Sequence, residues 1–371
     1  MTACLLGIIM LKVKVFTGVL RLSVFSFFAK QRFSLRFKQY LASVVLVWLA
    51  IALYRSTDYY QGFLYPQTQF ILLILATGYS LWSYILYMIV KPQPSTNKSY
   101  LIITALKNII GTTWYRARNS AAVQPSALNK VTSEQRTAIL FGLVKLFFVP
   151  LMINFLINNY QGLGNYLSTA LRHDYLLSII GFNTVLFPLL LSLLLIIDTA
   201  YFTFGYLVES NRLGNRVKSV DPTILGWIVA LICYPPFNIL VTNSIGWYAN
   251  DHAFFYNSFL TFAMRLLILS LMIIYVWASV ALGAKASNLT NRGIVARGPY
   301  RYVRHPAYVS KNLVWWLTLL PILKLVAVLG MLVWSTIYYL RAVTEERHLR
   351  LDPDYKRYCQ KVPYRFIPGI W

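Results

Sequence analysis

The stretch FLTFAMRLLILSLMIIYVWASVAL, residues 259–282, contains Arg265 as its one charged residue. It is longer than the roughly 20 residues that a helix needs to cross the hydrocarbon core of a bilayer. Other apolar runs recur along the chain, at residues 40–54, 68–90, 138–158, 176–198, 224–242 and 306–344. We therefore predict an integral membrane protein built of helices.

The composition of the 371-residue chain supports the membrane class. Hydrophobic residues make up 58% of it and charged residues 12%, and the mean hydropathy is +0.56. These values lie far from those of soluble globular domains. The three cysteines and four histidines are scattered, so we predict neither a disulfide framework nor a metal site.

The last apolar run, residues 306–344, is long enough for two crossings. Pro321 and Lys324 interrupt it. Because proline breaks a helix and a lysine is costly inside the bilayer, we expect a tight helical hairpin rather than one long helix. The predicted fold is all-α, a polytopic integral membrane helical bundle of about eight transmembrane helices that ends in this hairpin.

Three regions follow from this division of the chain. We expect residues 1–39 to form an interfacial amphipathic N-terminal segment, because Lys12, Lys14 and Arg21 interrupt its apolar stretch. Residues 40–282 are expected to form a six-helix transmembrane region, either a substrate pocket or a scaffold. The sequence after residue 282 carries the candidate chemistry.

The positive charges are distributed unevenly between the predicted loops. The net charge is +24, and 30 of the 35 Lys and Arg residues lie in alternate connections. These are the N-terminal arm, residues 91–137, 208–223 and 283–312, and the tail from Arg341. Basic loops stay on the cytoplasmic side, so we expect both termini to be cytoplasmic, in a bacterial inner membrane or in the endoplasmic reticulum. The charge is then explained by topology and by lipid headgroups, and we expect no nucleic-acid partner.

Lys145 and Arg265 lie inside predicted spans. Charges at such positions are costly and are often functional. Packing inside the bundle or snorkelling to the interface explains them equally well.

The basic segment ARGPYRYVRHPAYVSKN, residues 296–312, precedes the hairpin. Pro306 after His305 suits the first position of a helix. The unpaired N–H groups of that helix start, with Arg301, Arg304 and Lys311, predict either a site for a carboxylate or phosphate or a simple anchor to anionic lipid.

Glu345 and Glu346 are adjacent at the end of the hairpin's returning helix, in a chain with only 11 acidic residues. Each has an arginine four positions away, so a surface ion-pair ladder is one explanation. The hairpin would also return both carboxylates to the membrane boundary beside His305 and Tyr308, which indicates a site.

These motifs carry a family resemblance over residues 283–371. The sequence GPYRYVRHPAY, a hairpin of about forty residues and the paired glutamates resemble the catalytic core of the membrane methyltransferases that include isoprenylcysteine carboxyl methyltransferase and phospholipid N-methyltransferases. The resemblance implies S-adenosylmethionine as methyl donor, a membrane lipid or lipid-linked substrate, and no metal. The residues that would hold the cofactor are Arg304, His305, Pro306, Tyr308 and Glu345.

The same resemblance implies two catalytic residues. Arg341 and Glu346 keep the spacing of a pair that is linked to catalysis in the isoprenylcysteine enzymes. Arg341 would orient a carboxylate or phosphate acceptor, and Glu346 would act as base for an amine. Ser310 stands where the family commonly has glycine.

The tail gives an alternative. The sequence YKRYCQKVPYRFIP, residues 355–368, is similar to the end of sterol C14-reductases, which use NADPH. A NADPH-dependent double-bond reductase and a non-catalytic membrane protein with this fold therefore remain open beside the methyltransferase.

Overall fold

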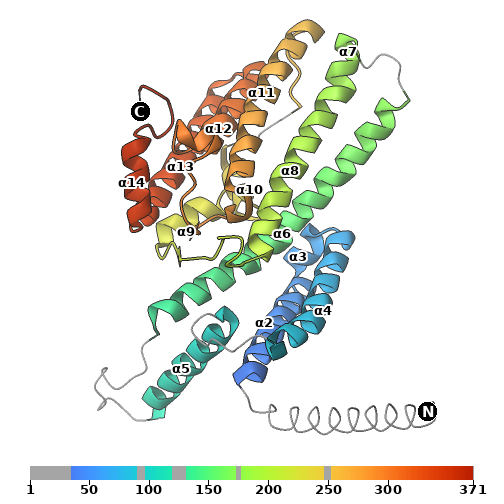
Figure 1. Ribbon diagram of the computed structural model, residues 1–371. Coiled ribbons are helices and arrows are strands. Elements are labelled where there is room, and N and C mark those ends of the chain that lie inside the picture. Colours follow the sequence, from blue (N-terminus) through green and yellow to red (C-terminus); the bar gives the residue numbers. More distant parts are fainter. Residues whose placement is uncertain (1–34, 90–96, 119–130, 173–176, 246–251, 371) are drawn as a thin grey trace, which may run out of the picture. The chain divides into compact units, whose positions relative to one another are not determined.

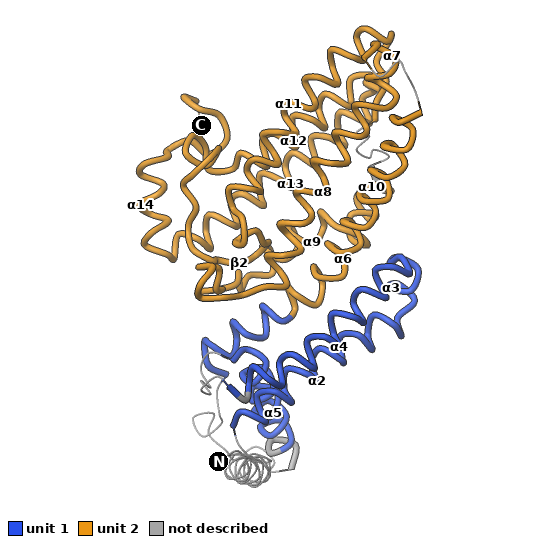
Figure 2. The backbone as a smooth tube through the Cα atoms, turned by 45° about the vertical axis from the view of Figure 1, so that its right-hand side comes forward, with its two compact units in different colours: residues 1–142 blue, residues 143–371 orange. Residues whose placement is uncertain are grey.

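The computed structural model divides into two compact units, residues 1–142 and 143–371 (Figure 2). The residues that it describes are 35–89, 97–118, 131–172, 177–245 and 252–370. Most of the predicted interfacial segment, residues 1–34, lies outside them, so that prediction and the three-region division stay predictions.

The described residues of the first unit form four helices and the first turns of α6 (Ser133–Ala170). The four helices are α2 (Leu35–Ser56), α3 (Asp58–Phe63), α4 (Pro66–Ile89) and α5 (Lys98–Arg118). Both α4 and α5 pack against α2. The ring of Tyr40 meets that of Tyr84 edge-on, with centroids 5.3 Å apart, and the Ser43 and Tyr87 hydroxyl oxygens are 3.0 Å apart. Aromatic and hydroxyl side chains thus join two otherwise apolar helices.

The boundary between the two units falls within α6 (Ser133–Ala170), and the second unit begins there. Its other elements are α7 (Ile179–Gly181), η3 (Phe182–Leu186), α8 (Phe187–Leu207), β1 (Ser219–Val220), α9 (Ile224–Leu231), α10 (Phe237–Ile245), α11 (Ser258–Leu282), η4 (Gly283–Lys285), β2 (Thr290–Asn291), η5 (Gly298–Arg301), α12 (Pro306–Leu319), η6 (Leu320–Ile322), α13 (Leu325–Leu349) and α14 (Pro353–Lys361). Helix α11 packs against both α8 and α12, around a core that includes Phe187, Ile268, Met272 and Val314 (Figure 1).

Six helical segments of the described residues are long and apolar enough to cross a membrane. They are Leu35–Ser56, Pro66–Tyr87, Ser133–Ala170, Ile179–Leu207, Ser258–Lys285 and Leu325–Leu349. The protein is an all-α polytopic membrane bundle, as predicted from the sequence, apart from the two-residue strands β1 and β2. The predicted count of eight spans is not confirmed.

The two remaining predicted spans are shorter than a bilayer requires. The chain at 224–242 forms α9 and α10 with a break between them, where Pro235 and Pro236 follow each other. Proline has no N–H to donate and its ring clashes with the preceding turn, so the helix stops there. Helix α12 has 14 residues.

The predicted hairpin is present. Pro321 lies in η6, the turn between the two helices, and Lys324 is the N-cap residue of α13. Helix α13 packs against α12, with the rings of Trp315 and Trp334 edge to face at 6.0 Å. The end of α13 is thereby returned to the start of α12.

The two charges predicted inside spans bind backbone carbonyls. Arg265 donates to the carbonyl oxygens of Asn183 and, at 2.9 Å, His252, and its guanidinium carbon lies 4.7 Å from the centre of the Phe187 ring. Lys145 donates to the carbonyl oxygen of Leu207 at 3.4 Å. These contacts favour the packing interpretation of both residues.

The loop that follows α11 packs directly on α8 at Gly205. A Cβ atom at Gly205 would lie 2.1 Å from the carbonyl oxygen of Ala286. Two hydrogen bonds hold the loop there: the Asn288 N–H donates to the Tyr206 hydroxyl at 2.7 Å, and Asn215 Nδ2 donates to the Ala284 carbonyl at 3.1 Å. Only glycine permits this close approach, which fixes the loop that later forms part of the cavity wall.

Gly205→Ala is expected to lower the free energy of unfolding by about 1–3 kcal/mol, the usual cost of overpacking a filled site. Thermal unfolding of the detergent-solubilised protein measures this. Gly164→Ala in α6 is the matched control, because a Cβ there has no atom within 4 Å and alanine favours the helix. Equal unfolding midpoints for the two variants would contradict the close approach at Gly205.

Candidate active site

A cavity of about 190 Å³ lies in the second unit. Its walls come from α8, α9, α11, the loop 284–295, the start of α12, the last turns of α13 and two tyrosines of α14. The cavity therefore lies where the hairpin returns the end of α13 to the start of α12.

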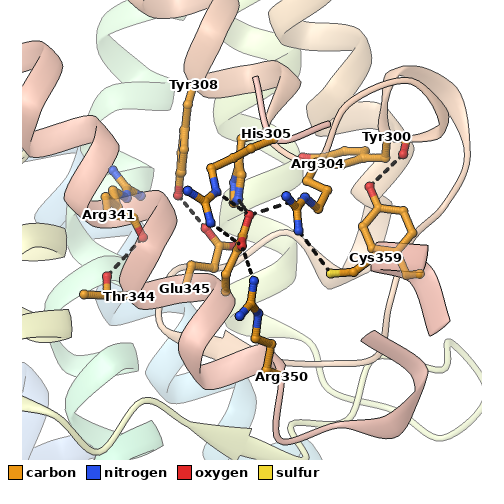
Figure 3. A network of polar contacts seen from close by, with 12 residues as sticks. Tyr300, Arg304, His305, Tyr308, Arg341, Thr344, Glu345, Arg350 and Cys359 are labelled. Atoms are coloured by element: carbon orange, nitrogen blue, oxygen red, sulfur yellow. Dashed lines mark hydrogen bonds and ion pairs between the residues drawn. The ribbon is translucent and has the colours of Figure 1, made fainter. Parts of the chain in front are cut away.

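The structure brings five of the seven predicted site residues to this cavity. Its lining includes Arg304, His305, Tyr308, Arg341 and Glu345. Pro306 is the buried first residue of α12 and fixes where that helix begins. Glu346 lies behind the wall, in a cluster of cations described below. Figure 3 shows the side chains from α12 and α13 converging on one another.

Tyr308 connects the two helices across the cavity. Its hydroxyl donates to Glu345 Oε2 at 2.8 Å, and its ring lies parallel to that of His305, with centroids 5.3 Å apart. Glu345 is exposed, so its carboxylate is accessible to a ligand. The carboxylate is therefore a group that a cation in the cavity can contact.

Arg341 is a buried cation without a carboxylate partner among the described residues. Its exposed fraction is 8%, and its guanidinium donates to Asn288 Oδ1. The guanidinium carbon lies 5.2 Å from the Tyr308 ring centre, 5.8 Å from that of Tyr234 and 5.9 Å from that of Tyr338. A buried charge held by an amide, the Cys233 thiol and aromatic rings is costly, and an anion in the cavity would neutralise it.

The helix start itself offers less to an anion than the sequence indicated. Of the three cations named there, Arg304 alone lines the cavity, and it already contacts Glu346. Arg301 is exposed, and Lys311 lies over the rings of Tyr275 and Trp315. These contacts make Arg341 a stronger candidate than the helix start for binding an anion.

Glu346 is surrounded by cations, and its exposed fraction is 1%. Arg365 donates to both of its oxygens, each at 3.0 Å, and His305 Nε2 lies 3.1 Å from Oε1. Arg350 Nη2 is 3.4 Å from Oε2, and Arg304 Nε is 3.5 Å from Oε1. Hydrogen bonding to Glu346 raises the pKa of Arg365 above its ordinary value. The catalytic role of Glu346 stays a prediction, and these contacts favour a positioning role.

The C-terminal tail runs beside the start of α12. The backbone N–H groups of Arg304 and His305 donate to the carbonyl oxygens of Tyr364 and Arg365, both at 3.0 Å, and Arg304 Nη2 donates to the Pro363 carbonyl at 3.0 Å. Together with the Arg365–Glu346 pair, these bonds form a clamp between the tail, α12 and α13. Arg365 was not among the predicted site residues, although its place in a basic, aromatic tail was the available signal.

Three tyrosines close the side of the cavity near the tail. Tyr300, Tyr355 and Tyr358 line it, and the Tyr358 hydroxyl donates to the Tyr300 carbonyl at 2.6 Å. Burial raises the pKa of all three phenols. They therefore stay neutral and present aromatic faces rather than negative charge.

A short ribbon forms another part of the wall. Strands β1 and β2 are antiparallel, with Ser219 opposite Asn291. Asp352 accepts hydrogen bonds from Lys218 at 2.9 Å and from Asn291 at 3.0 Å, which fastens the ribbon to the turn before α14. Burial by itself raises the pKa of Asp352, but these hydrogen bonds outweigh it and hold the pKa below its ordinary value. Strands of two residues have no periodicity that sequence analysis could find.

The fold and the cavity define a polytopic membrane protein whose second unit contains a candidate ligand site. Residues 260–351 match the model of the isoprenylcysteine carboxyl methyltransferase (ICMT) family, which confirms the resemblance noted in the sequence. The match covers about a quarter of the chain and extends from α11 to the end of α13. This part of the chain is thus similar to a family of membrane methyltransferases.

Neither the curated proteins nor the solved structures contain a match to the chain. The similarity of the tail to sterol C14-reductases is not shown by any comparison. Among the described residues, no group of three or more His, Cys, Asp and Glu side chains is placed to hold a metal ion.

Proposed function

We propose that the protein transfers a methyl group from S-adenosylmethionine to a lipid or lipid-linked acceptor at the cytoplasmic face of its membrane. The observation that carries the proposal is the cavity in which Arg304, His305, Tyr308, Arg341 and Glu345 meet. All five lie inside the segment that matches a methyltransferase family.

The residues of the cavity suit this cofactor. S-adenosylmethionine supplies an electrophilic methyl group on a positively charged sulfur. The exposed carboxylate of Glu345 offers that charge a favourable environment, and the neutral phenols of Tyr300 and Tyr355 add aromatic surface without competing charge. His305, stacked on Tyr308 and bonded to Glu346, keeps this wall rigid.

The chain's part in the reaction is orientation and exclusion of water. Methyl transfer is an in-line displacement, so donor and acceptor must be aligned and held close. Arg341 is the group that would orient an acceptor oxygen of a carboxylate or phosphate, because its charge has no carboxylate partner among the described residues. Such an oxygen is already nucleophilic, and no base is then required.

The position of the cavity supports a lipid acceptor and the cytoplasmic side. The cavity lies where spanning helices end, so an acceptor dissolved in the membrane can reach it laterally. The tail from Arg341 contains 7 of the chain's basic residues and contributes to the same site. Because basic segments tend to stay cytoplasmic, this charge supports a cytoplasmic location for this end of the second unit.

Glu345→Ala is expected to abolish S-adenosylmethionine binding, because it removes the cavity's exposed carboxylate and the partner of the Tyr308 hydroxyl. Lys324→Ala, at the other end of α13, is the matched control and should bind normally. Calorimetry with the purified protein measures both, with NADPH as the competing ligand. Unchanged binding in Glu345→Ala would refute the site, and binding of NADPH alone would refute the function.

The transfer itself is tested on the membrane lipids. Incubating the protein in lipid bilayers with methyl-labelled S-adenosylmethionine should give a lipid whose mass has increased by one labelled methyl group. If the cofactor binds but no lipid or lipid-linked molecule is labelled, the proposed acceptor class is wrong.

A further inference from the structure

Asp198 is a buried carboxylate in the membrane-spanning helix α8, and the family-matched residues do not include it. Its exposed fraction is 7%. The Tyr275 hydroxyl donates to Asp198 Oδ2 at 3.0 Å, and the Ser279 hydroxyl donates to Oδ1. Among the described residues, its hydrogen-bond partners are two hydroxyl groups of α11, and Lys311, whose ammonium group lies over the Tyr275 ring, interacts with it electrostatically. A carboxylate in this position is costly and calls for an explanation.

The hydrogen bonds to Asp198 determine how the two hydroxyl groups can act. A hydroxyl has one proton to donate and two lone pairs that accept. Because Tyr275 and Ser279 both give their proton to Asp198, each of them offers only lone pairs to anything else. The carboxylate also polarises both O–H bonds, which strengthens the oxygens as acceptors. The cluster is therefore selective for a hydrogen-bond donor.

Tyr275 and Ser279 both line the cavity described above, and Arg341 lines it too. Arg341 donates and is positive, whereas the Asp198 cluster accepts and has a negative charge behind it. The second unit thus offers complementary groups for two different parts of one ligand: an anionic part at Arg341 and a donor part at the Tyr275 and Ser279 oxygens.

We propose that Asp198, Tyr275 and Ser279 form a subsite for the ammonium group of a ligand whose carboxylate or phosphate binds Arg341. The inference rests on the proposed function. An ammonium beside an anionic group occurs in the amino-acid part of S-adenosylmethionine and also in an aminophospholipid headgroup. Both carry the chemistry that the subsite recognises.

A simple link between α8 and α11 is the competing explanation, because hydroxyl–carboxylate bonds also join helices. Helix links need no charge, and an asparagine at this position would supply the same contacts at lower cost in a bilayer. The position of both hydroxyl-bearing residues in the cavity lining is the observation that a link alone does not account for.

Asp198→Asn tests the subsite. The substitution keeps the shape, but the new amide donates to one of the hydroxyl oxygens and removes its role as acceptor. Binding is measured for two probe pairs that differ in the amine. The first is S-adenosylhomocysteine and its analogue with hydrogen in place of the α-amine. The second is phosphatidylethanolamine and phosphatidylethanol in vesicles. We expect Asp198→Asn to weaken binding of the amine-bearing member of one pair about tenfold or more, and to leave the amine-free member unchanged.

Thr199→Val is the matched control. Thr199 is the next residue of α8, is buried, and donates to the Leu195 carbonyl of its own helix at 2.6 Å, so its loss perturbs α8 without touching the cavity. It should bind all four probes as the unmodified protein does.

The two probe pairs identify the source of the ammonium. A selective loss for S-adenosylhomocysteine assigns the subsite to the cofactor, and a selective loss for phosphatidylethanolamine assigns it to the lipid. Equal losses for both members of each pair, or no loss, would overturn the subsite and leave Asp198 as a helix link. Failure of the proposed function looks different: the unmodified protein would not bind S-adenosylhomocysteine at all, while the lipid pair would still test the subsite.

Discussion

Arg341→Gln is expected to lower the rate of methyl transfer about 10²–10³-fold, the loss seen when one preorganised donor is removed from a site. Arg341 is a buried cation of the cavity, as is Arg292, and the guanidinium of Arg341 makes no ion pair with a described Asp or Glu. Glutamine keeps a hydrogen-bonding group but removes the charge that would orient an anionic oxygen. Initial rates with labelled cofactor, at saturating and limiting lipid acceptor, measure the loss.

The same variant is expected to keep or raise the unfolding temperature. Burying a charge without a counter-ion costs several kcal/mol, so removing that charge relieves the folded state. Arg347→Gln is the control, since Arg347 is on the same helix but exposed and contacts Thr223. Transfer within threefold of the parent protein would contradict the assigned role of Arg341, and a large fall in stability would show that its charge is compensated.

The sequence alone could predict the membrane spans and the C-terminal hairpin. The spans of α2, α4, α6, α8 and α11 follow from long apolar runs, because crossing a bilayer requires consecutive apolar residues regardless of packing. The hairpin follows from Pro321 and Lys324, which no continuous spanning helix accommodates well. The meeting of His305 and Tyr308 with the paired glutamates follows from the hairpin in turn.

The chemistry around those residues depends on contacts between distant segments. Asn288 contacts Arg341, which is 53 positions away, and Arg365 contacts Glu346, which is 19 positions away. Asp198 contacts Tyr275 and Ser279, which are 77 and 81 positions away. No local pattern marks such partners. The family resemblance gives Glu345 and Glu346 different roles, but the sequence does not show which of them faces the cavity. They differ by one position, about 100° around a helix, and that rotation directs one to the cavity and the other to the cations behind it.

Replacing Glu346 is expected to lower the stability of the fold, whereas replacing Arg341 is expected to keep or raise it. Its two oxygens already accept from Arg365 and His305, and Arg304 and Arg350 lie within 3.5 Å. Removing its charge leaves three arginines close together without their common counter-ion. Breaking a buried ion pair from one side in this way costs about 3–5 kcal/mol. The bonds that hold the tail against α12 weaken with it.

Glu346→Gln is therefore expected to lower the free energy of unfolding by about 3–5 kcal/mol and to make the tail susceptible to trypsin at Lys361 and Arg365 before the bundle unfolds. Glu345→Gln makes the same chemical change one residue earlier, at an exposed position, and should alter stability by less than about 0.5 kcal/mol. A double-mutant cycle with Arg365→Gln should show strong non-additivity, because both substitutions break one clamp. If instead Glu346→Gln keeps the stability and tryptic pattern of the parent protein but loses methyl transfer, Glu346 acts on the reacting groups, and its cluster of cations serves to set the charge of a catalytic carboxylate.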